Sequence, residues 1–495
     1  HDLTVTYQML QAFESVARAH DPQNKAPLVY KMESDKVFNA LITATLRCVP
    51  RVFQHYVPVA IPESTDEDIA AGRVVEREIP MLKDHQNWAR IKSQARLFFS
   101  ALQLLLAQLH DAQLATFIMR KAVDAMPYFL PFKHQVRRYL MRILYVFQDR
   151  TSEESALVTA FLTLRRLTLL APSQFLEESI RGLYKAYIRQ SQNVSVFTLP
   201  HINLLRQCGV ELLGFNTKLS YELAFVYIRQ LATQLRNAIT AKGRATYKVV
   251  YSWQFIQGLK FWTDALCTYH PRKLKQGSYS IDQAVNQQIA ANLPSLVYPL
   301  VQVITGTIGL MPNHLYFPLR FHCVRMLLQI SRDTGVYIPT ASYVLEVLQS
   351  RELNRKPLPS TLKAFPFETH IQCPKSYEHT QVYVDGIMDQ VTDITLEFMT
   401  QQAANIAFPE VIMPLVAELK RFVKANPKAK IVRPLRHLME KVRHHCDFIE
   451  QERSRVDWAP GDYHMVDTFL STTDIATTPL PKYYEGHIRV KQQQL

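Results

Sequence analysis

Apolar residues recur at helical spacing along most of the chain, in blocks of about 15 to 25 residues. The block 83–109 is an example, because Trp88, Ile91, Ala95 and Phe98 share one side of a helix. Prolines, glycines or polar clusters end the blocks, as they end helices. Further blocks with this pattern lie at 132–147, 173–191, 199–213, 219–240, 244–269, 296–311, 317–333, 340–353, 383–406, 409–425 and 432–456. No stretch shows the two-residue period of a strand, so the sequence predicts an all-α protein.

The order of the predicted helices favours one helical architecture. Adjacent blocks form pairs that repeat at about 40 residues, within the range of HEAT and armadillo repeats. In such arrays each helix pair buries its apolar face only by stacking on its neighbours. We therefore expect an α-solenoid of HEAT/armadillo-like helical repeats, with a compact helical bundle as the alternative.

Changes in composition divide the chain into six predicted segments. Acidic residues and prolines mark a linker after the first helices, and Pro357, Pro359, Pro366 and Pro374 exclude a helix from a later stretch. The segments are an N-terminal helical segment (1–57), an acidic proline-containing linker (58–80), a helical-repeat solenoid (81–353), an extended proline-rich basic strap (354–380), C-terminal helical repeats (381–458) and an irregular tail (459–495).

One uncharged stretch is long and apolar enough to be considered as a membrane-spanning helix. No Asp, Glu, Lys or Arg occurs from Gln283 to Leu319, and 296–311 is largely apolar. Two alternatives are a membrane-spanning helix and a buried helix of the array. Polar residues interrupt the stretch, prolines bound it and no basic flank sets an orientation, so the buried helix is favoured and no membrane partner is expected.

Composition argues against several classes of function. Only 13 of 495 residues are glycine, too few for the glycine-rich loops of nucleotide-binding α/β proteins, and no phosphate-binding or hydrolase motif occurs. The six cysteines are at least 50 residues apart and form no C-x-x-C pair, which indicates a reducing compartment rather than a disulfide framework. His322, Cys323 and the run His444-His445-Cys446 are interpreted as core or surface residues, because structural zinc sites use local ligand pairs. We assign no catalytic, cofactor-binding or metal-binding residue, and we predict a protein that is not an enzyme.

The excess of basic over acidic residues is the feature of the composition that says most about function. The chain has 57 Lys and Arg against 43 Asp and Glu, a formal net charge of +14. Between Lys420 and Arg443 there are nine basic residues and one acid, Glu440, beside an apolar seam that includes Leu435, Leu438 and Val442. A second cluster has His134, Arg138 and Arg142 in one column of a helix. Its basic residues are Arg120, Lys121, Lys133, Arg137, Arg138 and Arg142, and a third cluster consists of Lys242, Arg244, Lys248, Arg272, Lys273 and Lys275.

Like charges at this spacing repel, so they do not serve helix stability. Two alternatives remain: contact with the phosphates of a nucleic acid, and a solvated basic face. Without a sequence-reading motif, RNA contact would read backbone and shape. The candidate RNA-binding residues are Lys420, Arg421, Lys424, Lys428, Lys430, Arg433, Arg436, Lys441, Arg443, Lys133, Arg137, Arg138 and Arg142.

The strap combines basic and aromatic residues. Its candidate docking residues are Arg355, Lys356, Lys363, Phe365 and Phe367. They could dock a partner or RNA, or the two phenylalanines could fill a groove of the helical array. The sequence leaves these alternatives open.

Long blocks of the sequence resemble the nucleolar complex protein 2 family of assembly factors of the large ribosomal subunit. The blocks that carry the resemblance are 220–240 (SYELAFVYIRQLATQLRNAIT), 246–255 (TYKVVYSWQF), 298–304 (YPLVQVI), 316–323 (YFPLRFHC), 365–369 (FPFET), 374–377 (PKSY), 408–410 (FPE) and 448–460 (FIEQERSRVDWAP). The likeness covers roughly residues 38–460, without the family's polar N-terminal extension, so the sequence is expected to be an excerpt.

The resemblance implies a scaffold without catalysis that binds pre-ribosomal RNA in 60S precursors. It further implies alternating heterodimers with nucleolar complex proteins 1 and 3, contacts with other pre-60S factors, and a location in the nucleolus and nucleoplasm. It supplies no catalytic residue and no cofactor. A transport-receptor-like α-solenoid that carries protein cargo is the alternative, but a carrier of basic cargo would be expected to have acidic faces, which the net charge opposes.

Overall fold

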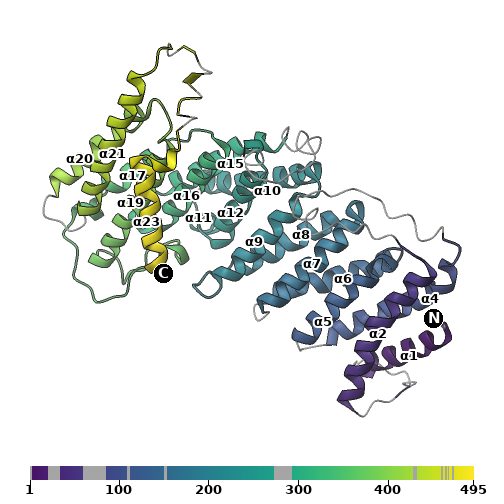
Figure 1. Cartoon of the computed structure of the whole chain (residues 1–495). Coiled ribbons are helices and arrows are strands. Elements are labelled where there is room, and N and C mark those ends of the chain that lie inside the picture. Colours follow the sequence, from purple (N-terminus) through teal and green to yellow (C-terminus); the bar gives the residue numbers. More distant parts are fainter. Residues whose placement is uncertain are drawn as a thin grey trace. The chain divides into compact units, whose positions relative to one another are not determined.

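The computed structural model describes residues 3–19, 30, 34–59, 85–108, 112–149, 153–272, 292–426, 432–458, 461–462, 465–466, 468–470 and 473–494. The regular structure in these ranges is helical, apart from one isolated bridge between Leu358 and Thr380 (Figure 1). The prediction of an all-α protein is confirmed. Of the predicted acidic linker 58–80, all but Pro58 and Val59 lies outside the described residues.

The chain divides into two compact units. Unit 1 comprises His1–Val226 and Leu274–Pro294, and unit 2 comprises Tyr227–Lys273 and Ser295–Leu495. The division falls within one helix, α10 (Thr217–Ala241). Each unit is described by itself below.

Unit 1 is built from helices that pack on their near neighbours in sequence, such as α6 on α7 and α8. Its centre is aromatic: Phe99 stacks on Phe129 at 4.0 Å, and Phe98 lies 5.8 Å from the same ring. The helices are α1 (Leu3–Ala19), α2 (Asp35–Tyr56), α4 (Trp88–Gln108), α5 (Ala112–Ala122), η2 (Val123–Phe129), α6 (Lys133–Gln148), α7 (Glu154–Leu170), α8 (Pro172–Gln190), α9 (Leu199–Leu213) and the first part of α10.

Unit 2 is arranged around α16, whose side chains are nearly all buried and which packs against α12, α15 and α19. Its helices are the last part of α10, α11 (Arg244–Val250), α12 (Trp253–Thr268), α15 (Val297–Leu310), η4 (His314–Tyr316), α16 (Phe317–Thr334), α17 (Ala341–Leu348), α18 (Arg351–Asn354), η5 (Phe367–Thr369), α19 (Gln381–Gln401), α20 (Phe408–Ala425), α21 (Val432–Ser454), η6 (Ile475–Thr477) and α23 (Pro479–Gln494); η3 (Leu293–Leu296) lies at the division from unit 1.

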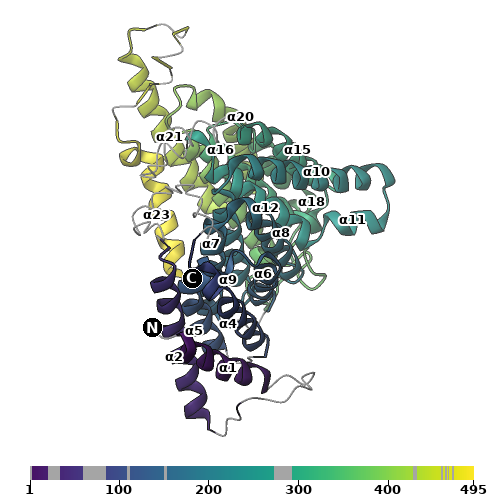
Figure 2. The same ribbon diagram turned by 90° about the vertical axis from the view of Figure 1, so that its right-hand side faces the viewer.

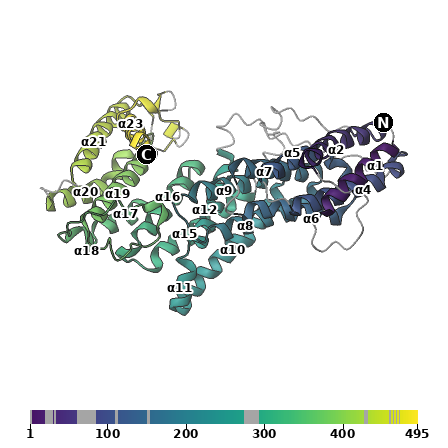
Figure 3. The same ribbon diagram turned by 90° about the horizontal axis from the view of Figure 1, so that it is seen from below.

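The predicted helical block 244–269 is two helices rather than one. The chain leaves the helix after Val250, and Ser252 caps the next helix by accepting a hydrogen bond from the backbone N–H of Phe255 at 3.3 Å. A serine inside an apolar pattern is compatible with both outcomes, so periodicity alone did not reveal the break. Figures 2 and 3 show α11 projecting with the end of α10 from the helices of unit 2.

The prediction of an irregular tail at 459–495 is wrong for its last part, where Pro479–Gln494 form α23. This helix packs against α19 and α21. Leu480 is fully buried, but much of the attachment is polar: His487 Nε2 lies 2.8 Å from Asp393 Oδ1, and Lys491 also pairs with Asp393. A helix held partly by ion pairs needs no continuous apolar stripe, so the pattern did not indicate it.

The uncharged stretch forms η3 and α15. By length and composition alone, 293–310 could cross a membrane, and 44% of it is buried within the protein. Its buried residues, among them Leu300 and Ile304, belong to a helix that packs against α12 and α16, which supports the buried-helix alternative. Gly306 permits a close contact with α10, because an added Cβ would lie 2.9 Å from Leu235 Cδ2.

Candidate nucleic-acid interface

The strongest basic cluster lies on an antiparallel helix pair, α20 and α21. Arg453 near the end of α21 donates to Glu410 at the start of α20, with Nη1 2.8 Å from Oε1. The His445 ring contacts the ring of Phe408 at 4.7 Å. Because the end of α21 meets the start of α20, the end of α20 at Ala425 and the start of α21 at Val432 lie at the other end of the pair.

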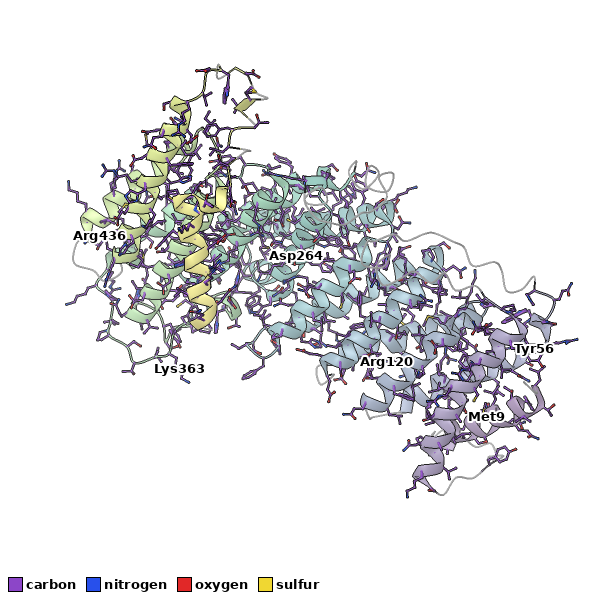
Figure 4. All side chains as sticks on the ribbon, in the orientation of Figure 1. Met9, Tyr56, Arg120, Asp264, Lys363 and Arg436 are labelled. Atoms are coloured by element: carbon purple, nitrogen blue, oxygen red, sulfur yellow. The ribbon has the colours of Figure 1, made fainter. Side chains whose placement is uncertain are left out.

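Five candidate cations gather at that other end, which we call the basic end. They are exposed, and they are Lys420, Arg421, Lys424, Arg433 and Arg436. The opposite faces of the two helices are buried through Leu415, Leu419, Leu435, Leu438 and Val442, so the predicted separation of a packing side and a basic side is confirmed. Arg436 lies on the outer side of the pair in Figure 4. Lys428 and Lys430 lie outside the described residues.

Helix electrostatics do not explain the basic end. Cations at the end of α20 suit the negative end of its dipole, but Arg433 and Arg436 lie near the positive end of the α21 dipole, whose first turn has no acidic residue. Arg433 lies in this first turn and is exposed, so its position costs stability in the free protein. An external anion would remove that cost.

Few of the candidate cations are neutralised by the chain's own carboxylates. Arg421 pairs with Glu418, and Arg137 pairs with Glu178 at 2.6 Å. Within the described parts of the chain, no ion pair forms at Lys420, Lys424, Arg433, Lys441, Arg443, Lys133, Arg138 or Arg142. Lys441 is half-buried and the others are exposed, so most of these heads are open to a ligand.

The second predicted cluster is divided between two helices of unit 1: Arg120 and Lys121 lie in the last turn of α5, and the other members lie on α6. Lys133, Arg137, Arg138 and Arg142 are all exposed on this helix, and its buried face points into the aromatic core through Tyr139 and Phe147. The first turn of α6 also lacks an acidic residue. The face is therefore basic along its length and only partly neutralised.

Two large side chains on the same face were missed by the sequence reasoning. Met141 is 64% exposed and Tyr145 is 62% exposed. Tyr145 follows Arg142 by three residues and Arg138 by seven, so the three lie along one side of α6. An exposed tyrosine beside arginines is the combination that nucleic-acid-binding proteins use to stack on unpaired bases. The spacing of Tyr145 from Arg138 and Arg142 in the sequence could have indicated that it lies on the basic side of the helix.

The third basic cluster is described in part: Lys273 and Lys275 lie outside the described residues, and Arg272 is exposed. Residues 227–250 carry five Lys or Arg and no acid. Lys242, Arg244 and Lys248 were expected from the sequence, and Arg229 and Arg236 join them along the exposed side of α10. Lys242 turns the chain between α10 and α11 with a positive φ of 44°.

In the strap, the aromatic candidate residues are buried and the basic ones are exposed. Phe365 and Phe367 are buried at 6% and 7% exposure, so they fill a groove of the chain itself, and the prediction that they dock a partner is corrected for these two rings. Arg355, Lys356 and Lys363 are exposed and stay available for contact. Lys363 lies at the edge of unit 2 (Figure 4).

The buried thiols and imidazoles have the properties of core residues. Burial raises the pKa of the Cys208 and Cys323 thiols to about 12, so they stay protonated and are poor nucleophiles. Burial also lowers the pKa of His322 well below its usual range, and its Nε2 lies 3.2 Å from the His370 carbonyl oxygen. Their interpretation as core residues is supported.

The Glu410–Arg453 ion pair predicts a pH dependence of stability. Hydrogen bonding by Arg453 lowers the pKa of Glu410 to about 2. A lowered carboxyl pKa stabilises the fold above the unfolded pKa of about 4.3, and the contribution is lost as the pH falls toward 2. Glu410 is 58% exposed, so Glu410→Gln should lower the free energy of unfolding by at most about 1 kcal/mol at pH 7. Urea unfolding at pH 7, 5 and 3 should show a shrinking difference; a difference that grows with acid would contradict the assignment.

The chain is similar in sequence to known proteins, and one of these matches covers its whole length. Residues 174–487 match the Noc2p family. An uncharacterised NOC2 family protein of Schizosaccharomyces pombe is 32% identical over 495 residues, which is 100% of this chain and 66% of that protein. Nucleolar complex protein 2 of Drosophila melanogaster is 30% identical over 416 residues, 83% of this chain and 51% of the relative. Nucleolar complex-associated protein 2 of Arabidopsis thaliana is 28% identical over 466 residues, 94% and 57% of the two chains. The chain thus spans about half to two thirds of the length of these relatives.

Proposed function

The chain belongs to the Noc2p family, and we propose that it is a non-enzymatic scaffold factor in the biogenesis of the large (60S) ribosomal subunit. Relatives named nucleolar complex protein 2 support a nucleolar role. We place the protein in the nucleolus and, with later precursors, in the nucleoplasm.

The proposed ligand is pre-ribosomal RNA. The observation that carries this proposal is the basic end of α20 and α21, where the exposed Arg433 lies in the first turn of α21, at the positive end of its dipole, with no acid in that turn. A polyanion is the ligand that turns this unfavourable placement into binding free energy. The exposed basic side chains of α6 and of the third basic cluster, at 227–250, supply further phosphate contacts.

The proposed protein partners are nucleolar complex proteins 1 and 3, as alternating heterodimer partners, with other pre-60S factors around them. We also propose that the helices form a HEAT/armadillo-like α-solenoid, because they pack mainly on their near neighbours in sequence. A scaffold of this kind offers long surfaces to RNA and protein together.

Cosedimentation tests the proposed function. Replacing Arg433, Arg436, Lys441 and Arg443 by glutamate should move the protein in a sucrose gradient of nuclear extract from large-subunit precursors to the free fractions. The matched control replaces Arg18, Arg181, Arg455 and Arg489, each of which pairs with a glutamate three or four residues away. If the first variant still sediments with the precursors, or the control is released equally, the proposal is wrong.

A further inference from the structure

Three residues from separate segments of unit 2 come together beside a cavity. They are His314 in η4, Glu352 in α18 and His379, two residues before the start of α19. Each offers one ligand atom, and these atoms lie within 4.8 Å of one another. We propose that His314, Glu352 and His379 form a binding site for a divalent transition-metal ion of the zinc class.

Glu352 is positioned as a ligand by its burial and its contacts. Its side chain is 3% exposed, so its negative charge needs a partner close by. Oε1 accepts the backbone N–H of His379 at 3.0 Å, and Oε2 accepts the ring Nδ1–H of His379 at 2.6 Å. A metal ion takes the place of the proton between Oε2 and Nδ1, and that proton leaves to solvent.

A second carboxylate is hydrogen-bonded to one imidazole and lies near the other. Glu378 Oε1 lies 3.2 Å from His314 Nε2 and 3.6 Å from His379 Nε2. With Nε2 of each ring facing this carboxylate, Nδ1 of each ring is the nitrogen left for an ion. A carboxylate that accepts from the outer nitrogen of a histidine ligand is the usual second contact of zinc sites.

The backbone at His379 is held in a conformation that side-chain-bearing residues rarely adopt. Its φ is +60°, and its carbonyl oxygen accepts the N–H of Leu358 at 2.8 Å. Backbone strain of this kind persists where the surroundings fix it, and it is concentrated at functional sites. This turn holds the His379 ring beside Glu352, and the two ligand atoms separate slightly when an ion replaces the proton between them.

The cavity supplies room for the remaining ligand. Its volume is 720 Å³, and its lining includes His314, Glu352 and His379 together with Arg320 and Glu346. Arg320 is neutralised by Glu346, with Nη1 2.8 Å from Oε2. Water from the cavity can complete a tetrahedral site with three protein ligands. The ion would join the two ends of the strap, because Glu352 precedes it and His379 closes it.

Metal titration of the whole chain tests the site. After treatment with EDTA, Co²⁺ should give visible absorption bands of a four- or five-coordinate site at one equivalent per chain, and Zn²⁺ should abolish them. The double variant His314→Gln, His379→Asn should weaken Zn²⁺ binding at least 100-fold; asparagine is used because it tolerates a positive φ. The matched control, His437→Gln, changes a histidine that is 59% exposed, and this variant should bind Zn²⁺ with the affinity of the parent chain.

Two results would overturn the proposal. One is the absence of Co²⁺ bands and of a Zn²⁺-dependent rise in melting temperature, with Mg²⁺ as the comparison. The other is unchanged Zn²⁺ affinity in the double variant. If that variant fails to fold by circular dichroism, the Co²⁺ spectrum and the melting temperature of the parent chain decide the matter. The result is independent of RNA binding, so it does not depend on the proposed function.

Discussion

Replacing Lys420, Lys424, Arg433 and Arg436 by glutamine should weaken binding to structured pre-ribosomal RNA by about 100-fold near 0.15 M salt. Each of these side chains is exposed at the basic end of α20 and α21. A phosphate contact releases counterions, and four lost contacts at about 0.7 each should make the slope of log affinity against log salt less steep by about 3. Fluorescence anisotropy over a range of salt concentrations measures both quantities.

A charge-matched variant separates local contact from net charge. Arg18, Arg181, Arg455 and Arg489 are also four cations, but each pairs with a glutamate on its own helix. Their replacement by glutamine changes the net charge equally and should leave affinity and salt slope within about twofold of the parent, because paired surface charges release few counterions. Equal losses in the two variants would mean that RNA responds only to overall charge, and the basic end would not be a site.

The helices and the basic faces were predictable because both depend on local spacing. Leu435, Leu438 and Val442 recur at helical intervals, and the structure buries them while Arg433 and Arg436 stay exposed. Sequence spacing fixes such a separation within one helix. The same argument explains the exposed column of α6.

Features that depend on contacts between distant segments were not predictable in this way. His314, Glu352 and His379 span 66 positions without a local ligand pair, so their proximity follows only from the packing of η4, α18 and the end of the strap. The helix α23 was missed because ion pairs with Asp393, 94 residues and more away in sequence, replace a strong apolar stripe. The spacing of apolar residues indicates which side of a helix is buried, but it does not indicate which charged side chains from distant segments will form ion pairs.

The burial of Phe367 predicts that Phe367→Ala lowers the free energy of unfolding by about 3 kcal/mol or more, the usual cost of deleting a buried phenylalanine ring. The ring is 7% exposed and is held between two helices. It lies 5.8 Å from the ring of Phe321 on α16 and stacks on Tyr383 of α19 at 5.8 Å. Urea unfolding, followed by tryptophan fluorescence, measures the loss; three of the four tryptophans, Trp253, Trp262 and Trp458, lie in unit 2.

The matched control distinguishes a packing role from a docking role. Phe197, between α8 and α9, is 93% exposed, and Phe197→Ala should change the free energy of unfolding by less than about 0.5 kcal/mol. The Phe367 ring packs closely on Gly386 of α19, where an added Cβ would lie 2.6 Å from its Cε2. If Phe367→Ala unfolds at the same urea concentration as the parent and only loses a partner, the ring is a docking residue after all. If stability falls while Lys363→Ala leaves it unchanged, the aromatic residues hold the strap on unit 2 and its lysines and arginines are free to meet RNA or protein.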